Sequence, residues 1–321
     1  VARLARRLQV SPQEVLDLNS ISKREARRFL RLEPEIQVPL HASSDLPSPF
    51  QAISFTPAIV QGQTGVVDVT TDEETALTGT FGATTLRFYE IESKEDGYRS
   101  GALIPTGALA APRDRILKIQ ADGRTMKISV PIVAGEYETQ YIVLPPSKGG
   151  LLEPQKVRSE LELLREIWAE NSGAQLWQEQ FRFPIAHGYQ QTSPYGARRS
   201  YNNGPVSSYH AGTDWSAPTG TPIVAPADGV VVLADGLEVR GGATVIDHGQ
   251  GVYSNFWHQS EILVEPGQPV RRGETIGLVG TTGLSTGAHL HWEVRVNGIA
   301  VDPLQWTDFY LPYGAELEGI D

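Results

Sequence analysis

Thirty-two glycines and 22 prolines interrupt this chain of 321 residues. Both residues work against long helices, because glycine loses the most conformational freedom in a helix and proline lacks the backbone donor that a helix needs. Short strands joined by turns tolerate such a density far better. The sequence therefore predicts a mainly β protein, and its length predicts more than one domain, at about 150 residues per domain.

Composition and charge exclude some partners. Hydrophobic residues make up 40% and charged residues 20% of the chain, which is ordinary for a soluble globular protein. The net charge of −11 gives no general attraction to nucleic acid or to anionic lipid. No apolar run approaches the roughly 20 residues that cross a bilayer. We predict no nucleic-acid partner and no membrane span, and we leave the oligomeric state open.

Residues 1–41 are predicted to form two short helices and a strand. A proline and a capping-box glutamate in Ser11-Pro12-Gln13-Glu14 mark a helix start. The run "VARLARRLQVSPQEVLDLNSI…IQVP" resembles part of a LysM module, a family that binds N-acetylglucosamine chains of peptidoglycan or chitin. The alternative is the helical remnant of a prosegment. Because the chain begins at Val1 inside an expected helix, we expect an upstream segment to have been removed.

Residues 46–148 are predicted to form an all-β sandwich of immunoglobulin-like type, with a spacer or regulatory role. Asp122-Gly123 separates two strand-like runs and is typical of a hairpin turn, because this pair accepts positive φ. We expect residues 137–144 to be the last strand of this sandwich, ended by Pro145-Pro146.

Residues 149–177 are predicted to contain a helix that links the sandwich to a domain at 178–321. Apolar residues recur at helical spacing, and Gly173 suits the end of the helix. We interpret this apolar stripe as a packing face; it consists of Val157, Leu161, Leu164 and Trp168.

Three short motifs in the last domain carry chemistry: His210-Ala-Gly-Thr-Asp214, Phe256-Trp257-His258 and His289-Leu290-His291. The alternation of apolar and polar residues after His289 favours a strand, and residues two apart on a strand share a face. Two imidazoles side by side suit a metal better than a hydrophobic core. The even spacing of His210 and Asp214 also keeps both on one side of an extended segment.

The chain has no cysteine, which excludes disulfides, thiolate metal sites and cysteine nucleophiles. Any metal site must use histidine and carboxylate. Three such ligands are typical of a catalytic zinc site, whose fourth position holds a water with a pKa lowered to about 7. An unligated histidine beside the metal can move protons or stabilise an oxyanion. The spacing alone does not decide whether His289 or His291 is the ligand.

Three longer segments carry a family resemblance. "YHAGTDWSAPTGTPIVAPADGVVV", "DHGQGVYSNFWHQS" and "VGTTGLSTGAHLHWEVRVNGIAVDPLQW" resemble the lysostaphin/LytM-type zinc metallopeptidases, over residues 193–306. The resemblance implies that one Zn²⁺ is bound by His210, Asp214 and His291. It also implies that His258 and His289 are the active-site histidines beside the metal.

Two positions depart from the family pattern. Phe256 and Gln259 flank His258 where the family usually has Tyr and Leu, which we expect to affect substrate fit more than chemistry. Arg198 and Arg199 lie just upstream of the first ligand and are candidates to hold the carboxylates of a peptide stem, or are a solvated pair. We expect His248 to serve a turn.

The resemblance further implies an antiparallel β core with the metal in an open groove, and peptide bonds of peptidoglycan as substrate. We therefore expect a zinc endopeptidase of the bacterial cell wall that acts outside the cytoplasm, in the periplasm, at the wall or secreted. One alternative is a wall-binding regulatory protein with an inactive peptidase fold. Another is a latent enzyme covered by its N-terminal domains, which predicts that a 178–321 fragment is faster than the full chain.

Overall fold

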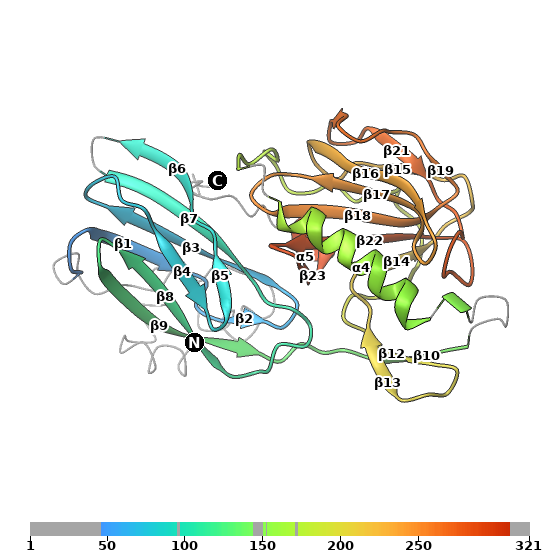
Figure 1. The fold of residues 1–321 in the computed structure, drawn as a ribbon, viewed down its shortest axis with the longest axis horizontal. Coiled ribbons are helices and arrows are strands. Elements are labelled where there is room, and N and C mark those ends of the chain that lie inside the picture. The colour runs from blue at the N-terminus through green and yellow to red at the C-terminus, as the bar shows by residue number, and fades with distance from the viewer. Residues whose placement is uncertain (1–45, 95–96, 144–149, 152, 171–172, 309–321) are drawn as a thin grey trace. The chain divides into compact units, whose positions relative to one another are not determined.

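The computed structural model describes residues 46–308, apart from 95–96, 144–149, 152 and 171–172. These residues form two compact units: unit 1 comprises 46–106 and 110–134, and unit 2 comprises 107–109 and 135–308. Strands dominate both units, so the prediction of a mainly β protein is confirmed (Figure 1). The predicted LysM-like segment at 1–41 lies outside the described residues.

Unit 1 is built from two β-sheets that share one core. The first has the order β1-β3-β7-β6, with β1 (Phe50–Phe55), β3 (Thr64–Thr71), β7 (Gly97–Pro105) and β6 (Tyr89–Lys94). The second has the order β2-β9-β8-β4-β5, with β2 (Ile59–Val60), β9 (Arg124–Val133), β8 (Asp114–Ala121), β4 (Thr78–Phe81) and β5 (Thr84–Leu86). Alternate side chains of both sheets fill the core, among them Val67, Val69, Leu117, Ile119 and Val130.

The predicted hairpin turn in unit 1 is confirmed. Strands β8 and β9 pair with Ala121 opposite Arg124, so the loop consists of Asp122 and Gly123 alone. Both residues have positive φ, 43° and 71°, as the tight two-residue hairpin requires.

One expected strand of the sandwich lies elsewhere. Strand β10 (Thr139–Ile142) belongs to unit 2, where it pairs in parallel with β12 (Arg198–Tyr201). The expectation that residues 137–144 close the sandwich was therefore wrong. Tyr137 explains the placement, because its ring packs edge-on against Tyr195 at 6.4 Å between centroids. The apolar partners of this segment come from unit 2.

Unit 2 is organised around one antiparallel sheet with the order β11-β14-β22-β18-β17-β16-β20. Its strands are β11 (Gln191–Ser193), β14 (Thr213–Ser216), β22 (His289–Val296), β18 (Val252–Gln259), β17 (Gly241–Asp247), β16 (Gly229–Leu237) and β20 (Pro269–Val270), with β23 (Ile299–Val301) paired to β22. A small sheet joins β15 (Pro222–Val224), β21 (Thr275–Leu278) and β19 (Glu261–Ile262), and another joins β10, β12 and β13 (Val206–Tyr209).

Helix α4 (Pro154–Ala169) lies across one face of this sheet, and the short helix α5 (Pro303–Asp308) follows β23 (Figure 1). The helix predicted near 154–171 is thus present, with proline in its first turn. Its Leu164 and Trp168 are buried against Val245 and Tyr253, so the predicted packing face is confirmed. No helix among the described residues is long and apolar enough to cross a membrane.

Candidate metal centre

Strand β22 has two very different faces. Its even-numbered residues form an apolar row that is fully buried: Leu290, Trp292, Val294 and Val296, each 0% exposed. Its odd-numbered residues form a polar row on the other face: His289, His291, Glu293 and Arg295. The predicted strand is confirmed, and it directs both histidines of the His-x-His motif to one side of the sheet.

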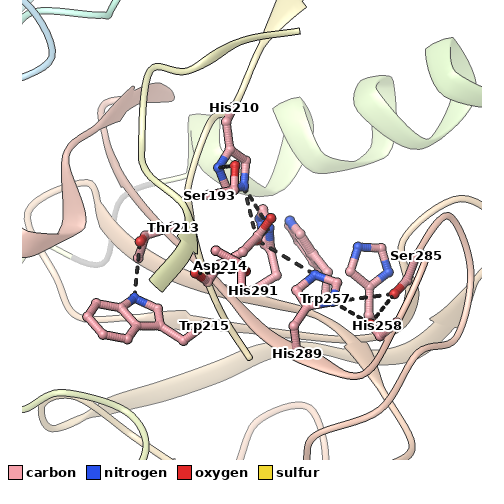
Figure 2. A network of polar contacts seen from close by, with 12 residues as sticks. Ser193, His210, Thr213, Asp214, Trp215, Trp257, His258, Ser285, His289 and His291 are labelled. Atoms are coloured by element: carbon pink, nitrogen blue, oxygen red, sulfur yellow. Dashed lines mark hydrogen bonds and ion pairs between the residues drawn. The ribbon is translucent and has the colours of Figure 1, made fainter. Parts of the chain in front are cut away.

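Strand β14 brings Asp214 to His291, because these two residues are direct partners in the antiparallel pair. Asp214 Oδ1 lies 2.7 Å from His291 Nδ1. His210 enters from the loop before β14, where its backbone N–H donates to the carbonyl of Ala197 at 2.8 Å. Its Nε2 lies 3.1 Å from Asp214 Oδ1 and 3.2 Å from His291 Nδ1 (Figure 2).

These three side chains offer one donor atom each, and all three atoms lie within 4.8 Å of one another. Zinc–ligand distances of about 2.0–2.1 Å place neighbouring ligands of a tetrahedral site about 3.3 Å apart. The observed donor separations of 2.7 to 3.2 Å are close to that value. The donor set and its spacing therefore fit one Zn²⁺.

The second nitrogen of each histidine is also engaged. His210 Nδ1 lies 3.1 Å from the Pro194 carbonyl and 2.9 Å from Ser193 Oγ. His291 Nε2 lies 3.3 Å from Glu293 Oε1. A carbonyl or carboxylate at one nitrogen keeps the proton there and leaves the lone pair on the other nitrogen for a metal. The tautomers that these contacts favour are those a metal requires.

The electrostatics favour a positive charge between the three donors. Burial opposes ionisation of Asp214, yet His210 and His291 hold the pKa of its carboxyl well below the usual range. Burial also disfavours the charged form of His291, but Asp214 and Glu293 outweigh it and raise the pKa of this imidazole. Burial lowers the pKa of His210 to about 4, so this ring is neutral and able to bind a cation at neutral pH.

His258 and His289 lie at the edge of this group. Their ring centroids are 5.2 Å apart, and the His258 ring lies 5.9 Å from that of His291. His258 Nδ1 lies 2.8 Å from the Thr282 carbonyl, and His289 Nδ1 lies 2.7 Å from the Gly287 carbonyl. Each ring therefore has its Nδ1 on a backbone carbonyl, and His289 Nε2 is 3.7 Å from Asp214 Oδ1. The structure thus brings all five predicted site residues together.

Burial affects the charge of both edge histidines. It lowers the pKa of His258 to about 3, with help from His291 and His289. Burial also lowers the pKa of His289, although Asp214 opposes this. The His289 side chain keeps 17% of its surface exposed, against 1% for His210 and 8% for His291. Solvent therefore reaches the group most easily at His289.

Arg199 has a different role from the one its position in the sequence suggested. Its guanidinium contacts Asp214 Oδ2 and Ser193 Oγ, both at 3.2 Å, so it neutralises the outer oxygen of the carboxylate. Arg198 donates to the Ala108 carbonyl at 3.0 Å and lies over the Tyr137 ring. Neither side chain is a solvated loop residue, and Arg198 lies away from the donor atoms.

Other residues weighed in the sequence are structural. His248 is 0% exposed, with its ring nitrogens on the Asp228 carbonyl and on Ser254 Oγ. Phe256 and Gln259 are 0% and 1% exposed, so the two departures from the family pattern face the interior. Sequence reasoning missed Glu293, although its spacing from His291 would have placed both on one face.

Comparison with known proteins identifies the fold around these residues. Residues 208–303 match Peptidase family M23. This part of the chain is therefore similar to the M23 peptidases and is called the M23 domain below. The match begins just before His210 and ends just after β23, so all five site residues lie inside the domain.

The M23 domain is similar to parts of longer proteins. It is 39% identical over 124 residues to the peptidoglycan DD-endopeptidase ShyA of Vibrio cholerae. The aligned region covers 39% of this chain and 29% of that relative. It is 46% identical over 95 residues to the DD-carboxypeptidase/endopeptidase Mpg of Neisseria meningitidis. This alignment covers 30% of this chain and 22% of that relative. The chain thus spans less than a third of the curated relatives it matches.

A solved structure matches more of the chain. A crystal structure from Pseudomonas aeruginosa, described as a peptidase M23, covers 78% of this chain and 95% of its own length. The TM-score is 0.58 and the sequence identity is 26%. The structural similarity therefore extends beyond the M23 domain itself.

Proposed function

We propose that this chain is a zinc-dependent endopeptidase that hydrolyses peptide cross-links or bridges of bacterial peptidoglycan. One Zn²⁺ would be held by His210 Nε2, Asp214 Oδ1 and His291 Nδ1. The observation that carries this proposal is the convergence of three metal donors and two further histidines in one M23 domain. The names of the relatives support the substrate class. Such a substrate implies action outside the cytoplasm.

Zinc bound at three protein ligands acts as a Lewis acid and lowers the pKa of a coordinated water to about 7. Around it, His258 and His289 each keep Nδ1 on a backbone carbonyl, which leaves Nε2 as a base. Burial lowers the pKa of both rings, so both imidazoles are neutral at neutral pH and each would offer an unprotonated Nε2 for hydrogen bonding to water or substrate.

The contact between Arg199 and Asp214 determines which carboxylate oxygen faces the metal site. Arg199 engages the outer oxygen Oδ2 of Asp214, while Oδ1 faces the two ligand histidines. The carboxylate is therefore directed to offer one oxygen to a metal. Its negative charge is partly offset by the guanidinium, so the centre keeps more of its ability to polarise a carbonyl.

The test is digestion of purified peptidoglycan by the zinc-loaded chain, with the fragments identified by mass spectrometry. We expect new amino termini in stem or bridge peptides, and the fragment masses identify the bond. His210→Ala is expected to lose both equimolar zinc and cleavage. Intact stem and bridge peptides after treatment with the zinc-loaded wild type would overturn the proposal and favour the regulatory alternative.

A further inference from the structure

Helix α4 lies outside residues 208–303, yet its buried face contacts the polar network of the metal centre. That face carries Glu160 and Trp168, which are 8% and 2% exposed. They are separated by eight residues, or about 12 Å along the helix. We propose that α4 is a brace for the active site, in which Glu160 positions His258 and Trp168 positions His291. The proposal rests on the proposed function only for its effect on turnover.

The first connection runs from Glu160 to the backbone beside His258. Glu160 Oε1 accepts from the Val239 backbone N–H, and Oε2 accepts from Arg240 at 2.9 Å. The Arg240 carbonyl in turn accepts from the His258 backbone N–H at 2.8 Å. His258 sits in the left-handed region, at φ 63°, which an L-residue adopts only when its surroundings enforce it. The segment that Glu160 fixes is one source of that enforcement.

The same segment also reaches the loop before His289. The Val239 carbonyl accepts from the Leu284 backbone N–H at 2.7 Å. The next residue, Ser285, places its Oγ 3.3 Å from His289 Nδ1. Glu160 therefore holds one short piece of chain that supports both active-site histidines.

The second connection runs from Trp168 to His291. The guanidinium of Arg295 lies over the Trp168 ring, 3.7 Å from its centroid. Arg295 pairs with Glu293 Oε2 at 2.9 Å, and Glu293 Oε1 faces His291 Nε2. The Trp168 indole N–H also donates to Asn255 Oδ1 at 2.9 Å, which fixes the ring. These side chains share one face of the sheet, because β22 and β18 pair Glu293 with Asn255.

A packing role alone does not account for Glu160. A buried carboxylate on an apolar helix face is costly unless it is paired and hydrogen-bonded. The neighbouring positions Leu161 and Leu164 show that the face packs with aliphatic side chains. The groups that support metal ligands and catalytic residues typically change affinity or activity by about 10- to 100-fold when they are removed.

The first connection is tested in the full chain with Glu160→Gln and Glu160→Ala. Glutamine keeps an acceptor for Val239 but loses the charge that pairs with Arg240. Glu162→Gln, on the exposed side of the same helix, is the matched control. We expect amide hydrogen exchange at His258 and Leu284 to accelerate in the order control, glutamine, alanine. We expect kcat to fall by about tenfold or more in the alanine variant, with KM and zinc affinity near wild type.

The second connection is tested with Trp168→Leu and the conservative Trp168→Phe. Phenylalanine keeps an aromatic face for Arg295, whereas leucine does not. Leu163→Ala, on the exposed face of α4, is the control. We expect Trp168→Leu to weaken zinc binding by about tenfold, measured by competition with a chromophoric chelator, and Trp168→Phe to restore most of it.

The outcomes separate the brace from the proposed function. Amide exchange and zinc affinity need no turnover, so they report on the brace even if wild type cleaves no peptidoglycan. The brace would be overturned if the Glu160 variants showed the amide exchange of Glu162→Gln and Trp168→Leu showed the zinc affinity of Leu163→Ala. A rise in exchange over all of unit 2, rather than at His258 and Leu284, would also overturn it and leave a general packing role.

Discussion

Replacing Glu293 by glutamine tests how far the metal centre depends on residues that do not bind the metal. Glu293 is 5% exposed and meets donors on both oxygens. Oε1 accepts from Trp257 Nε1 at 3.0 Å and faces His291 Nε2 at 3.3 Å. Oε2 pairs with Arg295 at 2.9 Å. Burial opposes ionisation, but Arg295 and His291 hold the pKa of the carboxyl well below its usual range, so it is charged at neutral pH.

A carboxamide offers a single oxygen to these donors. If that oxygen stays toward His291 and Trp257, the amide NH₂ meets the guanidinium of Arg295. Breaking a buried ion pair from one side costs about 3–5 kcal/mol. Arg295 retains the Gly298 carbonyl at 3.0 Å and the Trp168 ring, so we expect a loss of unfolding free energy of about 2–3 kcal/mol. Weaker orientation of His291 should lower zinc affinity by about 10- to 100-fold.

Urea denaturation in the presence of a chelator measures the first quantity, and competition with a chromophoric chelator measures the second. Glu265→Gln, an exposed glutamate of the same domain, is the control. Zinc affinity of Glu293→Gln within about twofold of wild type would refute the argument that Glu293 orients His291. A loss of unfolding free energy without a loss of zinc affinity would mean that Glu293 stabilises the fold through its ion pair with Arg295 and does not orient His291.

Three further predictions concern other parts of unit 2. Burial raises the pKa of Asp302 from 3.8 to about 6, so the folded state keeps a proton that the unfolded chain releases between these pH values. Unfolding free energy should therefore fall by about 2–3 kcal/mol as pH rises from 4 to 6, and Asp302→Asn should flatten this slope in denaturation curves. His258→Ala should keep equimolar zinc, measured by elemental analysis, while turnover falls by about 10²- to 10⁴-fold. A fragment 178–321, which lacks α4, should be slower in peptidoglycan digestion than a fragment 150–321; the reverse order would contradict the brace.

Local pattern was sufficient for several elements of this protein. Alternation after His289 predicted a strand, and the period of two placed both histidines on one face, as β22 does. Asp122-Gly123 predicted a two-residue hairpin because its φ requirement is local. The helix near 154–171 followed from its apolar spacing. Each of these inferences needed only residues a few positions apart.

Contacts between residues distant in the sequence could not be predicted from the sequence pattern. The strand pattern at 137–144 does not encode its partner, and β10 pairs with β12 some way along the chain. The contact between Glu160 and Arg240 joins residues 80 positions apart, and no local signal marks it. Arg199 was noticed as a cation near the first ligand, but only the folded geometry shows that it contacts Asp214. Such contacts depend on how the sheet is assembled.

The choice between His289 and His291 as metal ligand depends on both the local sequence pattern and the contacts made in the fold. Both project from the same face of β22, so spacing alone leaves the choice open. In the fold, His291 lies directly opposite Asp214, and its ring lies between the carboxylates of Asp214 and Glu293. His289 instead keeps one nitrogen on the Gly287 carbonyl, with a lowered pKa and a more exposed ring. His291 Nδ1 lies 2.7 Å from Asp214 Oδ1 and 3.2 Å from His210 Nε2, whereas His289 Nε2 is 3.7 Å from Asp214 Oδ1. This donor geometry supports His291 as the ligand and His289 as its catalytic neighbour.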